Sequence, residues 1–436
     1  MVFVLDKHKK PLMPCSEKRA RLLLQKGRAV IHRMAPFTIR LKGRLVGGSR
    51  LQPLRLKIKP GAEETGVAVL REETPDKSKV IMLLQIRHKP GVKRRMDSRR
   101  ALRRSRRNRK TRYRQPRFLN RRRPKGWLPP SLEARVNQTV NTIKRLTNLL
   151  PLTALSTEHA KFDTQLLQNP DISSMEYQQG ELFGYEVREY LLEKWGRKCA
   201  YCDKTGVPLE IEHIVPKARG GTNRVSNLAL ACHDCNQEKG ILTAKEFGHP
   251  EVQTKGKRPM KEEAMLNATR WRLYEQLNQT GLLLECGTAA RTKKQRIEHE
   301  LPKTKYHEAC CVGKSTPETL EIAERYVQVW SAKGRGTRKM CNTDKNGFPI
   351  SHRSRQKQYF GFQTGDLVVA KIPKGKYAGF HVGRVAVRAS GYFDIKTGSG
   401  KRTCQGISHK YFRVLQRAGG WQYEKKEEKA GNSSHG

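Results

Sequence analysis

Two pairs of cysteines, each spaced Cys-x-x-Cys, constrain the fold of this chain more than any other feature. The first pair is Cys199 and Cys202, and the second is Cys232 and Cys235. Four thiolates at these spacings can coordinate a structural Zn²⁺ tetrahedrally, which fixes two separate segments of chain against each other. The sequence therefore predicts a small zinc-stapled unit built around these four residues.

The residues between and after the two pairs suggest a purpose for this unit. Glu212 and His213 lie within residues 209–216, an alternating apolar stretch typical of a strand, and a Gly220-Gly221 turn follows. Asn227 comes next, and Asn236 stands directly after the second cysteine pair. This order resembles that of HNH nucleases, in which a strand–turn–strand–helix unit grips one catalytic metal.

The residue types suit cleavage of a phosphodiester, which needs an activated water and a cation to stabilise charge on the phosphate. His213 can accept a proton from water near neutral pH. Glu212 and Asn236 offer oxygen ligands of the kind that Mg²⁺ prefers, and Asn227 can orient the histidine or its loop. The alternative is a zinc knuckle that only stabilises a fold, with His213 an ordinary half-buried histidine.

The charge of the chain indicates a polyanionic partner. Its 436 residues include 89 Lys and Arg against 40 Asp and Glu, a formal net charge of +49. This excess favours association with nucleic acid. The sequence contains neither a long apolar run nor an apolar leader at the N-terminus, and its other six cysteines form no regular framework. We therefore expect a cytoplasmic protein with no membrane partner, and leave an organelle address open.

The most basic segment predicts a nucleic-acid-binding helix. Residues 94–112 contain neither Gly nor Pro, and arginine favours helices. The arginines expected to contact phosphates are Arg94, Arg95, Arg99, Arg100, Arg103, Arg104, Arg106 and Arg107. The alternative is a disordered basic arm, because these charges repel one another in isolation.

Two other stretches are typical of an RNase H-like fold. Residues 54–87 read as three strands, 54–58, 65–70 and 80–86, with a Pro60-Gly61 turn after the first. The position that normally presents a metal-binding aspartate holds Lys59. Glu158 ends a later strand, where such folds place a second carboxylate, although a surface glutamate is the simpler interpretation. Beyond residue 336, short strands with glycine turns predict a small β-rich module.

Taken in order, these motifs closely resemble the IscB family of transposon-associated, RNA-guided DNA endonucleases. The resemblance rests on Lys10-Pro-Leu-Met-Pro14, the arginine helix, Glu158 with Lys161-Phe-Asp163, the HNH unit, and the segment from Lys303 to Ala309. It implies a RuvC domain split in three, an inserted HNH domain and an omega RNA that guides the enzyme to double-stranded DNA. It also implies a bacterial, nucleoid-associated protein acting as a monomeric ribonucleoprotein.

The resemblance also divides the chain. The expected order is an N-terminal βαββ domain (1–52), RuvC-I (53–87), a bridge helix with linker (88–130), RuvC-II (131–180), HNH (181–250), RuvC-III (251–335) and a C-terminal module that reads a target-adjacent motif (336–425). The remaining residues, 426–436, are expected to be a disordered tail because the end of the chain is rich in Glu and Lys and then in Gly, Asn and Ser.

The sequence departs from the family at the RuvC site. Lys59 replaces the usual aspartate, Lys305 replaces a histidine, and Glu308 replaces a second aspartate. An ammonium repels Mg²⁺, so we expect a degenerate site in which Lys59 bridges Glu158 and Glu308. The predicted function is a nickase that uses HNH alone. The alternatives are cleavage of both strands, or a non-guided HNH nuclease or DNA-binding regulator.

Overall fold

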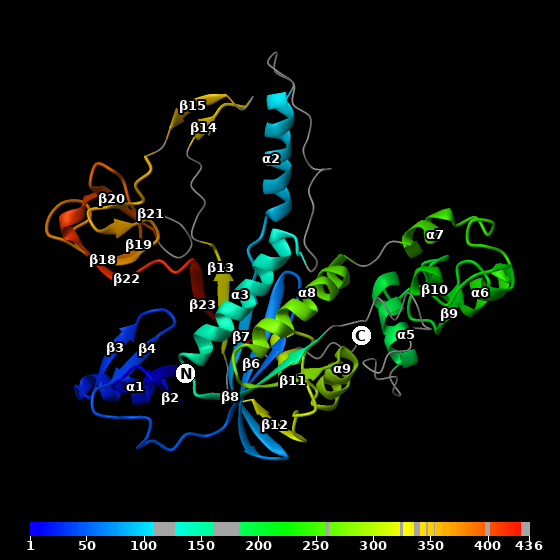
Figure 1. Cartoon of the computed structure of the whole chain (residues 1–436), viewed down its shortest axis with the longest axis horizontal. Coiled ribbons are helices and arrows are strands. Elements are labelled where there is room, and N and C mark those ends of the chain that lie inside the picture. The colour runs from blue at the N-terminus through cyan, green and yellow to red at the C-terminus, as the bar shows by residue number, and fades with distance from the viewer. Residues whose placement is uncertain are drawn as a thin grey trace.

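The computed structural model (Figure 1) is an α/β chain of several units, and it describes most of the sequence. The described residues are 1–107, 127–159, 183–257, 261–322, 326–334, 341–345, 348–352, 354–396 and 402–428. Lys161 to Asp163 therefore lie outside the described residues. No described helix is both long and apolar enough to cross a bilayer.

An eight-stranded sheet forms the centre of the molecule, in the order β11-β8-β5-β6-β7-β13-β23 with β12 beside β7. Its strands are β5 (Leu54–Lys59), β6 (Glu64–Thr74), β7 (Lys77–Arg87), β8 (Leu152–Glu158), β11 (Leu283–Gly287), β12 (Thr319–Ile322), β13 (Tyr326–Ala332) and β23 (Trp421–Glu427). β5, β6 and β7 form an antiparallel meander, whereas β5, β8 and β11 run parallel. Segments far apart in the sequence thus share one sheet.

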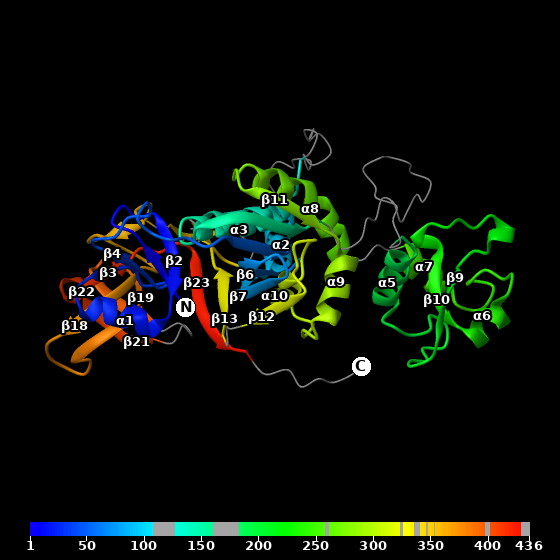
Figure 2. The ribbon, with the colours of Figure 1, turned by 90° about the horizontal axis from the view of Figure 1, so that it is seen from below.

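Helices cover both faces of this sheet (Figure 2). α3 (Pro130–Thr147) and α8 (Lys261–Asn278) pack on one face, while α9 (Ala289–Glu298) and α10 (Lys305–Cys310) lie on the other. Successive residues of a strand point to opposite faces. The apolar residues of β5 accordingly face α3 and α8, and its basic residues face α10.

The N-terminal unit has one strand more than predicted. Its elements are β1 (Val2–Leu5), β2 (Pro11–Cys15), α1 (Glu17–Gln25), β3 (Ala29–Arg33) and β4 (Thr38–Leu41), with sheet order β2-β1-β4-β3. The proline-containing segment was expected only to lead into the helix. It forms the edge strand β2, a position that tolerates proline because one side of the strand needs no N–H donor.

The arginine-rich segment forms α2 (Val92–Arg107), which projects from the sheet domain (Figure 1). Its arginines at positions 94, 95, 99, 100, 103 and 104 are all exposed. Of Arg106 and Arg107 only the backbone is described, and residues 108–126 lie outside the described part of the chain. The described helix therefore presents basic side chains to the surroundings along its length.

The cysteine-containing unit has its own core and lies to one side of the central sheet domain (Figure 1). It comprises α5 (Phe183–Trp195), β9 (Leu209–His213), the short helices η1 (Lys217–Arg219) and η2 (Val225–Asn227), β10 (Leu228–Cys232), α6 (His233–Lys239) and α7 (Pro250–Lys257). Val252 of α7 is part of this core, so the unit extends to residue 257 and not only to 250.

The C-terminal module is a five-stranded antiparallel sheet, in the order β21-β20-β19-β18-β22. Its strands are β18 (Leu367–Ile372), β19 (Gly379–Ala386), β20 (Tyr392–Lys396), β21 (Arg402–Ser408) and β22 (Phe412–Gln416), with η3 (His409–Tyr411) before the last. Two hairpins precede it: β14 (Cys341–Thr343) with β15 (Pro349–His352), and β16 (Gln358–Tyr359) with β17 (Phe362–Gln363).

The chain then returns to the central sheet, which corrects two predicted boundaries. β23 pairs with β13 from Trp421 to Glu427, so the C-terminal module ends before residue 421. The expectation of a disordered tail from residue 426 is wrong for residues 426 and 427, which belong to this strand. The Lys- and Glu-rich composition that suggested disorder instead protects the exposed edge of a sheet.

Candidate nuclease sites

The four cysteines of the two pairs form a cluster suited to zinc. Cys199 and Cys202 follow α5, Cys232 ends β10 and Cys235 lies in the first turn of α6. Their four sulfurs lie within 4.8 Å of one another, and those of Cys202 and Cys232 are 3.6 Å apart. Two sulfurs on one tetrahedral Zn²⁺ are about 3.8 Å apart, given Zn–S bonds of about 2.3 Å. The predicted ligand set is therefore assembled.

β9 and β10 form the hairpin that carries the expected nuclease residues, with His213 paired to Leu228. Asn227 fixes the loop of this hairpin. Its side-chain oxygen accepts from Val215 N at 2.9 Å, and its amide donates to Val215 O at 2.9 Å and to Thr222 O at 3.0 Å. Of the two roles expected for Asn227, the described contacts are those of a residue that orients the loop.

His213 is half-buried at the end of β9, and its ring is oriented by a residue that the sequence interpretation missed. Nε2 lies 3.0 Å from Oδ1 of Asn223. In the tautomer whose Nε2–H donates to this amide oxygen, Nδ1 keeps the lone pair that a general base needs. Asn223 lies in the loop between the strands, and its Asn-Arg context gave no signal of this role.

Glu212 points into the interior of the unit and is 4% exposed. Its carboxylate lies 3.0 Å from the Lys239 ammonium and accepts a hydrogen bond from the Tyr201 hydroxyl. Burial, followed by the charge of Glu212, raises the pKa of Tyr201 well above its ordinary value. The hydroxyl therefore remains a donor at all ordinary pH values. Tyr201 and Lys239 were not predicted, since neither neighbours Glu212 in the sequence.

Asn236 contacts a different carboxylate, so the structure does not join Glu212 and Asn236 directly. The Asn236 amide donates to Glu210 Oε2 at 2.6 Å, and His233 Nδ1 lies 3.1 Å from Glu210 Oε1. Glu210 stands two residues before Glu212, so both lie on the face of β9 that meets α6. These carboxylate and amide oxygens suit Mg²⁺. A cation on Glu212 would take the place now held by the Lys239 ammonium.

A second cluster lies at the carboxyl ends of β5 and β8 in the central sheet. Lys59 ends β5, Glu158 ends β8 and Glu308 lies on α10. The Lys59 ammonium is 2.5 Å from Glu158 and 3.9 Å from Glu308, and its side chain is 6% exposed. The structure thus brings together the three residues of the expected degenerate site, with an ammonium between the two carboxylates.

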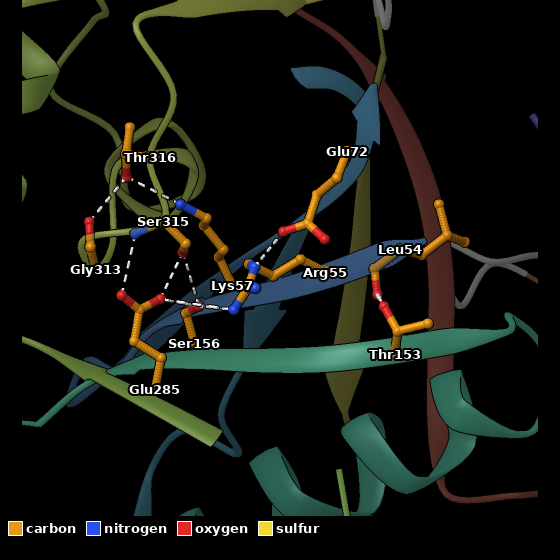
Figure 3. Close-up of polar contacts among 10 residues, drawn as sticks. All are labelled: Leu54, Arg55, Lys57, Glu72, Thr153, Ser156, Glu285, Gly313, Ser315 and Thr316. Atoms are coloured by element: carbon orange, nitrogen blue, oxygen red, sulfur yellow. Dashed lines mark hydrogen bonds and ion pairs between the residues drawn. The ribbon is translucent and has the colours of Figure 1, made fainter. Parts of the chain in front are cut away.

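The same face of β5 carries two more basic residues (Figure 3). Lys57 is fully buried and donates to Thr316 Oγ1 at 2.9 Å, and burial lowers the pKa of Lys57 to about 8. Arg55 lies 2.5 Å from Glu72 and 3.7 Å from Glu285. Each basic residue of β5 thus has at least one polar or acidic partner.

Glu285 on β11 completes this network (Figure 3). It accepts from Ser156 Oγ at 2.7 Å and from Ser315 N at 3.0 Å. Burial acts to raise the pKa of Glu285, but the hydrogen bonds from Ser315 and Ser156 outweigh burial and lower it. On the α10 face of the sheet, basic side chains therefore neutralise carboxylates that bound cations would neutralise in a metal site.

Comparison with known proteins supports part of this description. A family model described as "RRXRR protein" matches residues 2–180, and a model described as "HNH endonuclease" matches residues 199–250. The chain thus carries an HNH endonuclease domain, which contains all four cysteines, His213 and Asn236. No curated protein matches the chain.

Solved structures give a distant likeness to Cas9 enzymes. The type II-C Cas9 of Actinomyces naeslundii aligns with a TM-score of 0.22 and 13% identity, over 61% of this chain and 59% of that enzyme. Streptococcus thermophilus Cas9, solved in complex with the GGAA PAM, aligns with a TM-score of 0.19 and 10% identity, over 59% and 32%. The chain spans less than two thirds of the length of either enzyme.

Proposed function

We propose that this protein is an RNA-guided DNA endonuclease that nicks its target through the HNH domain. The observation that carries the nickase assignment is the Lys59 ammonium, which lies 2.5 Å from Glu158 where a divalent cation would have to bind. The nuclease assignment is supported by the HNH match and by the geometry of His213.

In the proposed reaction, His213 accepts the proton of the attacking water at Nδ1 while Asn223 holds the ring. Asn227 fixes the loop after His213, and the zinc cluster joins both ends of the hairpin. A divalent cation held by Glu212 and Asn236 would stabilise the charge on the phosphate. Glu210 positions Asn236, which donates a hydrogen bond to it, whereas the cation would replace the Lys239 ammonium that now pairs with Glu212.

The guide is proposed to be an omega RNA. The supporting features are the exposed arginines of α2, the net charge of +49 and the resemblance of the ordered motifs to IscB proteins. The target would be double-stranded DNA, with the C-terminal sheet reading a short adjacent motif and base pairing reading the rest. Isolation of the protein without bound RNA would favour the non-guided HNH nuclease instead.

The test is cleavage of a DNA target whose two strands carry different labels. The protein with its co-purified RNA should cut the guide-paired strand and leave the displaced strand whole. His213→Ala should abolish that cut while leaving DNA binding unchanged, because His213 is needed for proton transfer and lies outside the core. Cleavage of the guide-paired strand by His213→Ala would refute the assignment of HNH as the working nuclease.

A further inference from the structure

A basic cavity of about 380 Å³ lies between the N-terminal unit and the carboxyl end of α3. Its charged and titratable lining residues are Lys9, His32, Arg33, Lys144 and Arg145. A smaller cavity adjoins it, shares Arg33 and Arg145, and reaches the C-terminal sheet. No Asp or Glu lines either cavity, and all their lining residues belong to the described chain. The two cavities are thus lined by residues of three units of the fold, and the charged residues among them are all basic.

Neutral groups hold two of these arginines in place. The guanidinium of Arg145 donates to the Tyr423 hydroxyl and lies 6.0 Å from the ring centre of Trp421. Arg384, in the smaller cavity, donates to Gly365 O at 2.9 Å and to Trp421 O at 3.0 Å. Such contacts fix the orientation of a guanidinium without cancelling its charge, which remains available to an external anion.

Arg417 provides an internal contrast. It also lines the smaller cavity, but its guanidinium lies 2.9 Å from the buried carboxylate of Asp366. Arg417 is therefore an arginine of this region whose charge is neutralised within the fold. Arg145 and Arg384 differ from Arg417, because the contacts described above for them are with uncharged carbonyl, phenol and ring groups.

The cations of the larger cavity repel one another. Burial lowers the pKa of His32, and the charges of Lys9 and Arg33 lower it further. Burial also lowers the pKa of Arg145, and the charge of Arg33 acts in the same direction. An anion placed between these groups would relieve the repulsion.

Stabilisation of a helix end explains only part of this cluster. Lys144 and Arg145 lie in the last turn of α3, where cations interact favourably with the helix dipole. Arg33 and Arg384 lie on strands of other units, so interaction with a helix dipole does not explain their positions. The side-chain amide of Gln416 accepts from Ala35 N at 3.0 Å and donates to Ala35 O at 2.8 Å, which fixes the N-terminal unit against the C-terminal sheet. The walls of the site are thus held in place by contacts without charge.

We propose that this cavity binds the phosphodiester backbone of a nucleic acid, with a phosphate lying between Arg33, Lys144 and Arg145. The bound strand would join the N-terminal unit, α3 and the C-terminal sheet through one set of contacts. The identification of the anion as nucleic acid rests on the proposed function, whereas the anion site itself rests on the cavity. The site is separate from α2 and from both nuclease clusters.

The test compares two variants that each lose two positive charges. Arg33→Gln with Lys144→Gln neutralises the cavity while keeping polar side chains. Lys77→Gln with Lys79→Gln is the control, because Glu321 lies within 3.9 Å of Lys77 and is paired with Lys79. Affinities for a short RNA duplex, a DNA duplex of unrelated sequence and inorganic phosphate are measured between about 50 and 200 mM salt. Cleavage is not part of the readout, so failure of the nuclease assignment does not affect it.

We expect the cavity variant to reduce the magnitude of the slope of log affinity against log salt by roughly 0.9 for RNA, DNA or both, since the cavity is proposed to hold one phosphate and each lost phosphate contact reduces the slope by about 0.9. The control should leave the slope within experimental error, and both variants should melt at the temperature of the unmodified protein. The arm that responds identifies the strand. Equal slope changes in the two variants, or none in either, would overturn the proposal, and a response to inorganic phosphate alone would reduce it to a small-anion site.

Discussion

The role of the Lys59 ion pairs can be tested by measuring the stability of the central sheet domain. Glu158 is 3% exposed and its carboxylate lies 2.5 Å from the Lys59 ammonium, and the Glu308 carboxylate lies 3.9 Å from the same ammonium. Lys59→Met keeps most of the side-chain volume but leaves two facing carboxylates without a cation. Removing one partner of a buried ion pair costs about 3–5 kcal/mol. We therefore expect that loss of unfolding free energy, which is a large share of the roughly 5–15 kcal/mol typical of a domain.

Lys59→Asp should respond to metal in a way that Lys59→Met does not. It places three carboxylates together, so the sheet domain should be less stable than the unmodified domain in chelator and regain stability as Mg²⁺ is added. The unmodified domain should melt at the same temperature with or without Mg²⁺. Thermal unfolding of the three proteins, each in chelator and in Mg²⁺, measures these differences.

Two results would refute this reasoning. One is a Lys59→Asp variant that is as stable as the unmodified protein in chelator, which would show that the ammonium is not needed between the carboxylates. The other is cleavage of the displaced strand by a variant that carries His213→Ala and keeps Lys59. That result would show that the second site works despite Lys59.

Three further predictions concern the zinc cluster, the HNH site and a buried histidine. Cys235→Ser should unfold the HNH domain and lose about one bound Zn per chain by metal analysis, whereas Cys286→Ser should change neither. Lys239→Met leaves buried Glu212 without its cation, so that domain should lose about 3–5 kcal/mol in Mg²⁺-free buffer that retains the zinc and should recover when Mg²⁺ is added. A melting temperature that does not change with Mg²⁺ would contradict this. Burial lowers the pKa of His88 to about 4, so stability is full above about pH 6.5 and falls by roughly 3 kcal/mol as pH drops to 4; His88→Gln should flatten that dependence in thermal melts.

The geometry of His88 explains the sign of that pH effect. Its Nε2 lies 2.9 Å from the Thr65 hydroxyl and its Nδ1 lies 3.0 Å from the side-chain oxygen of Gln138. One neutral tautomer satisfies both contacts, with Nδ1 as donor and Nε2 as acceptor. The unfolded chain, which has no such restriction, takes up the proton more readily as pH falls, and acid therefore favours unfolding.

Local patterns in the sequence were sufficient to predict several features of both clusters. Alternation of apolar residues predicts β5 to β7, and the cysteine spacing predicts the zinc ligands, because these signals depend on neighbouring residues. The position of Glu158 at a strand end follows in the same way. These features needed no knowledge of which strands pair.

The remaining features depend on contacts between distant segments. Lys239 meets Glu212 only because α6 packs across β9, and nothing within α6 marks that lysine as buried. β23 pairs with β13 although its Lys- and Glu-rich sequence resembles a disordered tail. Strand pairing across so many residues is set by the register of the whole sheet, which a local pattern does not contain.

The position of Lys305 explains why the single substitution Lys59→Asp should produce little cleavage of the displaced strand. A Cβ added at Gly66 would lie 1.8 Å from Lys305 O, so the start of α10 packs tightly on β6 and has little room to shift. The Lys305 side chain reaches the loop that follows Lys59, where its Cε lies 3.5 Å from the Cβ position of Gly61. Lys59→Asp would therefore leave a second ammonium close to the new carboxylate, which weakens Mg²⁺ binding without abolishing it. Substituting Lys305→His and Glu308→Asp as well removes that charge and shortens the facing carboxylate, so the triple variant should cut the displaced strand more than Lys59→Asp alone.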